Sequence, residues 1–196
     1  MDQSSNIKRL LFAGLGICLT ASLCEASAGL GRDGARECYL ATLRAASSDT
    51  DQAGFHACSL ALDGAVDPDM RAGLLANRAY IRLRMADYPG TVADADASLS
   101  LAPDLAAANL NRGAGLIGMG RYQDALPPLE KAVASSNGDK LKLAYYNRAI
   151  AREHLGDIRG AYFDYKKATE LDPKFAPAQE QLTRFTVTVG AGPDVR

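Results

Sequence analysis

A short motif, asparagine-arginine followed by a small residue, occurs three times in this chain at nearly constant spacing. The copies stand at residues 77–79, 111–113 and 147–149, so the second follows the first after 34 residues and the third follows after 36. Each copy lies in an apolar pattern of helical period, which is followed by a turn and a second such pattern. A fixed period of this length is typical of stacked supersecondary units rather than of one globular core.

The clearest unit covers residues 142–175, where two amphipathic patterns meet at Gly156-Asp157 and end at Asp172-Pro173. Similar turn and helix-end signals elsewhere in the chain predict that it is divided into helix-turn-helix hairpins. It consists of a degenerate N-terminal hairpin (29–66), three full units (67–105, 106–141 and 142–175), a capping helix (176–187) and a tail (188–196). The capping helix is expected to cover the last apolar face with Leu182 and Phe185.

Local signals set several helix ends. Asp67 is expected to cap a helix that has Pro68 at its first position. Pro127 and Pro128 fall inside an expected second helix that begins near Asp124, where proline removes a backbone donor, so we expect a late start or a kink.

The N-terminus has the layout of a secretory signal. Lys8-Arg9 precede an apolar run from Leu10 to about Leu23, and small residues end at Ala26-Ser27-Ala28, which predicts a cleaved segment 1–28. The alternative is an uncleaved anchor, but the run is shorter than the ~20 residues that span a bilayer.

Removal of this segment leaves Cys38 and Cys58 in a chain sent to an oxidising compartment. We expect these two cysteines to form a disulfide, which closes a loop of about 20 residues and contributes roughly 3 kcal/mol in the chain-entropy treatment. The alternative is a pair of buried thiols that pack as small apolar groups.

When the units are aligned, small or apolar residues agree slot by slot. The slots are Ala79, Gly113 and Ala149; Ala86, Gly120 and Gly156; Thr91, Ala125 and Ala161; Ala95, Leu129 and Tyr165; and Ser98, Ala132 and Ala168. This pattern resembles the tetratricopeptide repeat, although the family's tryptophan is missing and Arg78, Arg112 and Arg148 stand where leucine is common. Small residues in these slots are expected to let the helices approach closely. The resemblance implies an all-α, right-handed superhelix of helix-turn-helix hairpins with a C-terminal capping helix.

The arginines of the motif need partners if they are packed. Asp94 and Asp164 follow Arg78 and Arg148 by 16 residues and are expected to accept their guanidinium groups. Pro128 occupies that slot in the middle unit, so Arg112 needs another partner. We expect these pairs to hold helices together rather than to bind a ligand.

The same resemblance implies a peptide-binding concave face, lined by the first helix of each hairpin. In proteins of that family, asparagines at the matching slot bind the backbone or terminal carboxylate of an extended peptide, since an amide offers both a donor and an acceptor. The alternative is that each asparagine contacts only the neighbouring helix. The candidate peptide-binding residues are Asn77, Asn111, Asn147, Tyr80, Arg84, Tyr146 and His154.

Composition and motifs argue against other classes of protein. The net charge of −1 suggests neither a nucleic-acid partner nor a membrane surface after signal cleavage. The chain has two histidines, no paired-cysteine metal spacing and no glycine-rich phosphate loop. We therefore expect no catalytic residue, metal or cofactor.

These observations predict an exported, periplasmic scaffold of a bacterial envelope that binds a protein or peptide partner on its concave face. The bacterial assignment comes from the resemblance. Two alternatives stay open: an assembly subunit that uses its convex face or self-association, and an enzyme whose chemistry the motifs do not reveal.

Overall fold

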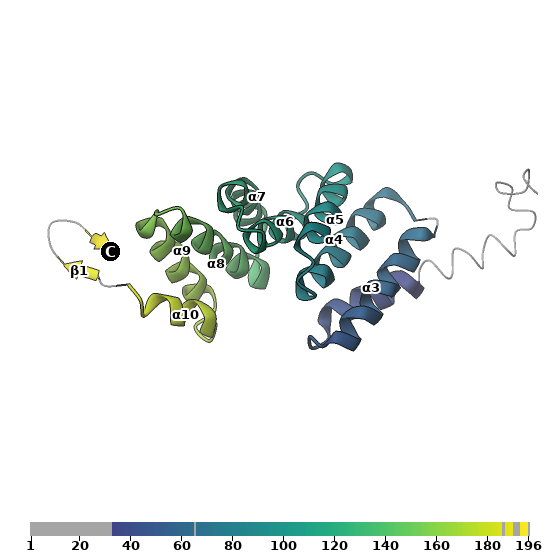
Figure 1. The fold of residues 1–196 in the computed structure, drawn as a ribbon, viewed down its shortest axis with the longest axis horizontal. Coiled ribbons are helices and arrows are strands. Elements are labelled where there is room, and N and C mark those ends of the chain that lie inside the picture. The colour runs from purple at the N-terminus through teal and green to yellow at the C-terminus, as the bar shows by residue number, and fades with distance from the viewer. Residues whose placement is uncertain (1–32, 65, 186, 190–192, 196) are drawn as a thin grey trace, which may run out of the picture.

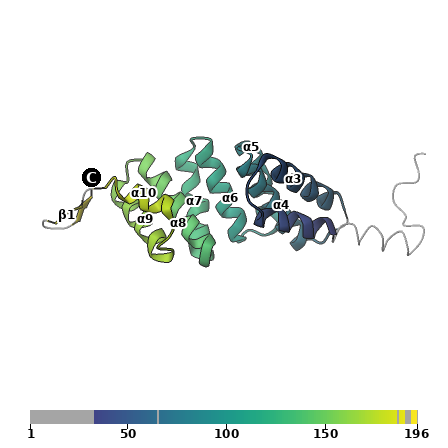
Figure 2. The same cartoon turned by 90° about the horizontal axis from the view of Figure 1, so that it is seen from below.

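Helical hairpins stack into an arch in the computed structural model, which describes residues 33–64, 66–185, 187–189 and 193–195 (Figure 1). The expected signal segment 1–28 lies outside these residues. The first hairpin pairs a helix that includes residues 33–43 with α3 (Ser48–Asp63). The next helices are α4 (Pro68–Arg84), α5 (Tyr88–Leu101), α6 (Ala106–Gly118), α7 (Tyr122–Ser135), α8 (Gly138–His154), α9 (Ile158–Leu171) and α10 (Ala176–Leu182). Figure 2 shows them in chain order along the long axis.

Side-chain caps set the starts of α3 and α4. The side chain of Asp67 accepts a hydrogen bond from the Met70 amide, and Pro68 is the first residue of α4, which confirms the predicted cap. Helix α3 begins at Ser48, because Ser47 and Thr50 form a reciprocal capping box.

The middle unit differs from its prediction at α7. The late start is wrong, because the helix begins at Tyr122 and runs through Pro127 and Pro128. The two prolines leave the carbonyl groups of Gln123 and Asp124 without helical donors. Both of these residues are exposed, so water can satisfy the carbonyls. The following helix α8 begins at Gly138, before the predicted start of its unit at residue 142.

The small residues in the repeat serve two purposes. Those between the helices are fully buried in all three units, including Ala125 and Ala161, which confirms close helix approach. The turn slot is different: Ala86, Gly120 and Gly156 have φ of 58°, 71° and 83°. The space around Gly120 and Gly156 is open, so this slot is small because the backbone is left-handed there.

The two ends of the stack are closed in different ways. At the N-terminal end, Cys38 and Cys58 are joined by a disulfide and form a core with Leu74 and Ile81. At the C-terminal end α10 packs against α9, and Leu182 and Phe185 contact the core around Tyr165, as expected.

The capping helix is shorter than predicted, since it ends at Leu182. Beyond it, the short strands β1 (Val187–Val189) and β2 (Pro193–Val195) pair antiparallel, with Val187 opposite Val195. Within the described residues, this strand pair differs from the predicted all-α fold, and it lies outside the stacked hairpins.

Candidate binding groove on the inner wall

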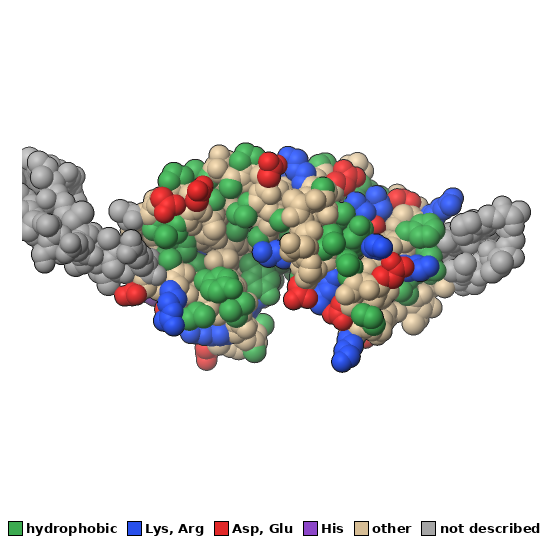
Figure 3. Space-filling view, turned by 180° about the vertical axis from the view of Figure 1, so that it is seen from behind, with side chains coloured by type: hydrophobic (Ala, Val, Ile, Leu, Met, Phe, Trp, Pro, Cys, Tyr) green, Lys and Arg blue, Asp and Glu red, His purple; other side chains and the backbone are tan. Residues whose placement is uncertain are grey.

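The first helices of successive units contact one another: α4 contacts α6, and α6 contacts α8. They therefore form a continuous inner wall, while each second helix packs behind its own first helix. Seen from behind, the surface is indented between the two arms of the arch, and hydrophobic side chains lie in the recess (Figure 3).

One hollow of about 410 Å³, which we call the inner hollow, is shared by the first helices of four hairpins. It is lined by Tyr39, Thr42, Leu43, Ala76, Asn77, Tyr80, Ala107, Leu110, Asn111, Asp139, Lys140 and Leu143. Tyr39 and Leu43 are 55% and 65% exposed, so two large apolar side chains stand at its edge in contact with water. A hollow with apolar walls and few polar groups is the usual form of a ligand site.

Two of the three motif asparagines meet in the inner hollow, beside Tyr80. Asn111 is buried, and its Nδ2 donates to the carbonyl of Ala76, 2.8 Å away. Ala76 belongs to α4, so Asn111 makes the contact with a neighbouring helix that was the alternative prediction for the asparagines. Its Oδ1 makes no hydrogen bond within the described part of the chain, which leaves an acceptor on the same amide. Asn77 is half-buried, whereas Asn147 does not line this hollow.

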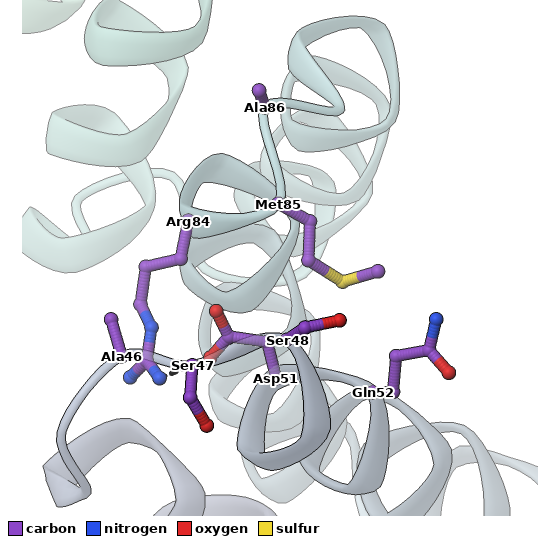
Figure 4. Close-up of a pocket in the computed structure, with 8 residues that line it drawn as sticks. All are labelled: Ala46, Ser47, Ser48, Asp51, Gln52, Arg84, Met85 and Ala86. Atoms are coloured by element: carbon purple, nitrogen blue, oxygen red, sulfur yellow. Dashed lines mark hydrogen bonds and ion pairs between the residues drawn. The ribbon is translucent and has the colours of Figure 1, made fainter.

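Arg84, which was predicted to bind peptide, does not line the inner hollow. Its side chain is only 10% exposed and pairs with the Asp51 carboxylate. The guanidinium also donates to the carbonyls of Ala41 and Arg44 at 3.3 and 3.1 Å. Figure 4 shows it reaching from the end of α4 to the turn at Ser47. Arg84 therefore fastens α4 to the first hairpin.

Tyr146 and His154 lie farther along the chain, in a second hollow of about 470 Å³ between α8 and α10, which we call the polar hollow. Here Glu153 accepts hydrogen bonds from the Tyr165 hydroxyl at 2.9 Å and pairs with Arg184 at 2.7 Å. Burial raises the pKa of Tyr146 and, together with the bond to Glu153, that of Tyr165. The His154 ring is exposed and stacks on Tyr122, with centroids 4.0 Å apart.

The predicted arginine-aspartate pairs are confirmed. Arg78 and Arg148 each bind the aspartate 16 residues on, Asp94 and Asp164, through two hydrogen bonds of 2.7 and 2.8 Å. The hydrogen bond to Asp164 raises the pKa of Arg148. In the middle unit Arg112 instead binds Asp96 of the preceding unit at 2.6 Å.

Sequence reasoning missed a second arginine in each network. Arg82 and Arg152 lie one helical turn after the motif arginines and contact the same aspartates, at 2.9 and 2.8 Å. Their spacing of four residues was the available signal, since residues four apart share a helix face. None of these groups lines the inner hollow, so the networks are structural.

Within the described residues, no cluster of three or more metal-ligating side chains is present, and no helix is long and apolar enough to cross a membrane. His56 and His154 both lie on the surface.

The sequence model of the tetratricopeptide repeat family matches residues 143–175. Among curated protein sequences, none matches the chain. Among solved structures, MamA (residues 41 to the end) of Desulfovibrio magneticus RS-1 is similar, with 24% identity, a TM-score of 0.62, and coverage of 80% of this chain and 81% of that one.

Two further structures share the fold. The first tetratricopeptide domain of Spaghetti (RPAP3), bound to the HSP90 peptide SRMEEVD, is 22% identical with a TM-score of 0.55, covering 61% of this chain and 92% of that one. YrrB, described as having an unusual peptide-binding site, is 14% identical with a TM-score of 0.57, covering 69% and 67%. The predicted superhelix of hairpins is thereby confirmed.

Proposed function

We propose that this tetratricopeptide-repeat protein is a non-enzymatic scaffold that binds an extended segment of a partner protein in the inner hollow. The observation that carries the proposal is the convergence of four first helices on one hollow with apolar walls and two asparagine side chains. Amides can bind main-chain groups of any sequence. Because the helices are already packed, the receptor loses little conformational freedom on binding.

The similar structures agree with this role. One of them is bound to a peptide, and another is described as having a peptide-binding site. The likeness shows a shared fold, so the position of the ligand in this chain is argued from its own inner hollow.

We place the protein in the periplasm of a bacterium, after cleavage of segment 1–28. The disulfide between Cys38 and Cys58 supports an oxidising compartment. Thiol titration of the unfolded, non-reduced protein recovered from the periplasm should detect no free thiol. Because segment 1–28 carries Cys18 and Cys24, the mass of the titrated chain must first show that this segment has been removed. Two free thiols in the cleaved chain would then contradict the bridge.

A second candidate function, an assembly subunit, is favoured by exposed apolar side chains on α9. Phe163 and Leu171 are both solvent-exposed on this second helix, away from the inner hollow. An association surface of this kind would pair copies of the chain or fix it to a complex.

Photo-crosslinking separates the two functions. We would introduce benzoylphenylalanine in place of Tyr39, at the edge of the inner hollow, or in place of Phe163 on α9, and irradiate living cells. A partner crosslinked from position 39 but not from 163 supports groove binding. Crosslinks only from position 163, with a dimer or larger species in size-exclusion light scattering, support assembly.

The repeat supplies a matched control for the groove. Asn77→Ala removes an amide that lines the inner hollow, whereas Asn147→Ala removes the amide at the same repeat slot outside it. The yield of partner crosslinked by benzoylphenylalanine at position 39 should fall at least tenfold in Asn77→Ala and stay unchanged in Asn147→Ala. Equal capture in both variants would contradict the proposed site.

A further inference from the structure

We infer that the inner hollow takes an internal, uncharged segment with apolar side chains, rather than an acidic chain terminus. This inference rests on the proposed function and names the chemistry of the ligand. Three features of the described residues carry it: the apolar edge, the balanced charge of the lining, and the state of the asparagine amides.

The apolar edge of the inner hollow is exposed to water. Tyr39 and Leu43 come from consecutive turns of one helix and face the same hollow, with more than half of their surface in water. Leu110 of α6 and Leu143 of α8 add to its apolar wall. Apolar side chains of a ligand would remove this surface from water, which is the main favourable term in such binding.

The charges of the lining cancel. Asp139 and Lys140 are the charged residues among those that line the inner hollow. Lys142, the next cation along α8, is already paired with Asp139 at 2.9 Å and with Asp172 at 2.5 Å. Arg84 is held by Asp51. An acidic peptide would therefore be desolvated without a matching group of cations, which is unfavourable.

The amides favour main chain over a carboxylate. One N–H of the Asn111 Nδ2 is used by the Ala76 carbonyl, so the side chain can offer a ligand its second N–H and the acceptor Oδ1. A carboxylate can use only the N–H and would bring its charge near the Oδ1, whereas the main chain of an internal segment offers both a carbonyl and an N–H to match this amide. The geometry thus suits a segment that passes through the hollow.

Selection from a random library tests the inference without naming a partner. We would pan a phage library of random dodecapeptides, joined to the coat protein by their C-termini, against the purified chain. Selected peptides would then be synthesised with blocked ends and titrated by fluorescence polarisation, beside the acidic peptide SRMEEVD. We expect selected sequences rich in Leu, Ile and Phe, with at least tenfold weaker binding of SRMEEVD.

Two exposed leucines provide the matched variants. Leu43→Glu places a charge at the edge of the inner hollow, and Leu60→Glu places one on α3, where Leu60 is 57% exposed and does not line it. Binding of the selected peptides should weaken at least tenfold in Leu43→Glu and stay within twofold in Leu60→Glu. Far-ultraviolet circular dichroism of both variants checks that they fold.

Each contrary outcome has a definite meaning. Charged peptides that lose affinity in Leu43→Glu, or SRMEEVD binding as tightly as the selected peptides, would overturn the apolar ligand while keeping the groove. If no peptide is enriched, or if affinity is the same in both variants, the inference and the proposed function fail together.

Discussion

The unit α8–α9 and the middle unit α6–α7 occupy equivalent places in the stack but are held by different chemistry. In α8–α9, Asp164 is buried and binds both Arg148 and Arg152. Beside it Tyr165 is fully buried, with its hydroxyl bound to Glu153. Charged and polar groups thus connect the two helices of this hairpin.

In the middle unit the same slots are apolar. Pro128 replaces the aspartate, Leu116 replaces the second arginine, and Leu129 replaces the tyrosine. Leu116 and Leu129 are fully buried in one core, and Gly113 makes room for Leu129. The two units therefore show that the repeat keeps its helices closely packed, whereas the side chains between the helices can be polar or apolar.

Leu129→Ala should have the largest effect on stability. The side chain is fully buried, so we expect a loss of about 3 kcal/mol in the free energy of unfolding, from lost apolar contact and a residual cavity. Urea denaturation followed by circular dichroism measures it. Leu60→Ala, at an exposed leucine, is the control and should change stability by less than about 0.5 kcal/mol.

A second substitution turns this result into a test of fit. A methyl group at Gly113 would lie 2.4 Å from Leu129, so Gly113→Ala alone should destabilise by about 2 kcal/mol. On the Leu129→Ala background it should instead stabilise, because alanine is the better helix former and the pair then matches Ala79 and Ala95 of the first unit. Additive effects in the double-mutant cycle would refute the packing argument.

Asp164→Ala should lower the free energy of unfolding by about 2 kcal/mol, which is less than the loss expected for Leu129→Ala. Two arginines lose a buried partner, but both are partly exposed and regain some hydration. Asp96→Ala removes the pair formed by Arg112, in which the aspartate is 52% exposed, and should cost less than about 0.5 kcal/mol. Equal losses of stability in the two variants would mean that the ion pairs of Asp164 in α8–α9 and of Arg112 in the middle unit are equivalent.

Pro127→Ala should stabilise the middle unit by about 1 kcal/mol. Pro127 is exposed, so little packing is lost, while alanine restores a helical donor to the Gln123 carbonyl. Thermal unfolding at neutral pH measures the change. A lower melting temperature would show that the proline is needed for the path of α7.

The smallest expected effect is a pH dependence of stability that comes from the unit α8–α9. The pKa of Tyr165 is raised above the value of about 10 in an unfolded chain. Its contribution is fully present below pH 10, and it is lost as the pH rises because the unfolded phenol ionises first. The expected loss is less than about 1 kcal/mol at pH 10.5.

Denaturant titrations at pH 8 and pH 10.5 measure this loss. Tyr165→Phe should flatten the decline without removing it, since the pKa of Tyr146 is raised too. Tyr39→Phe is the control, because its ring is exposed and lies in another hairpin. An unchanged pH profile in Tyr165→Phe would exclude Tyr165 as a source of the decline.

The groove itself was only partly predictable. The asparagine slot repeats in the sequence, and two of its copies do line one hollow. Nothing local separates Asn147 from them, or shows that Arg84 is used by Asp51 of α3 and by the turn before that helix. Tyr39 and Leu43 were missed as lining residues because the first hairpin lacks the repeat motif and only stacking brings it to the inner wall.

By itself, the sequence determined the period, the hairpins, the cap at Asp67 and the arginine-aspartate pairs at 16-residue spacing. These features depend on helical geometry and on contacts within one unit, which recur wherever the pattern recurs. Tertiary structure alone decided which copies of a slot face a ligand and which face the protein. Each slot is completed by the neighbouring unit, and the neighbours at the two ends of the stack, a disulfide-linked hairpin and a short capping helix, are unlike those in its middle.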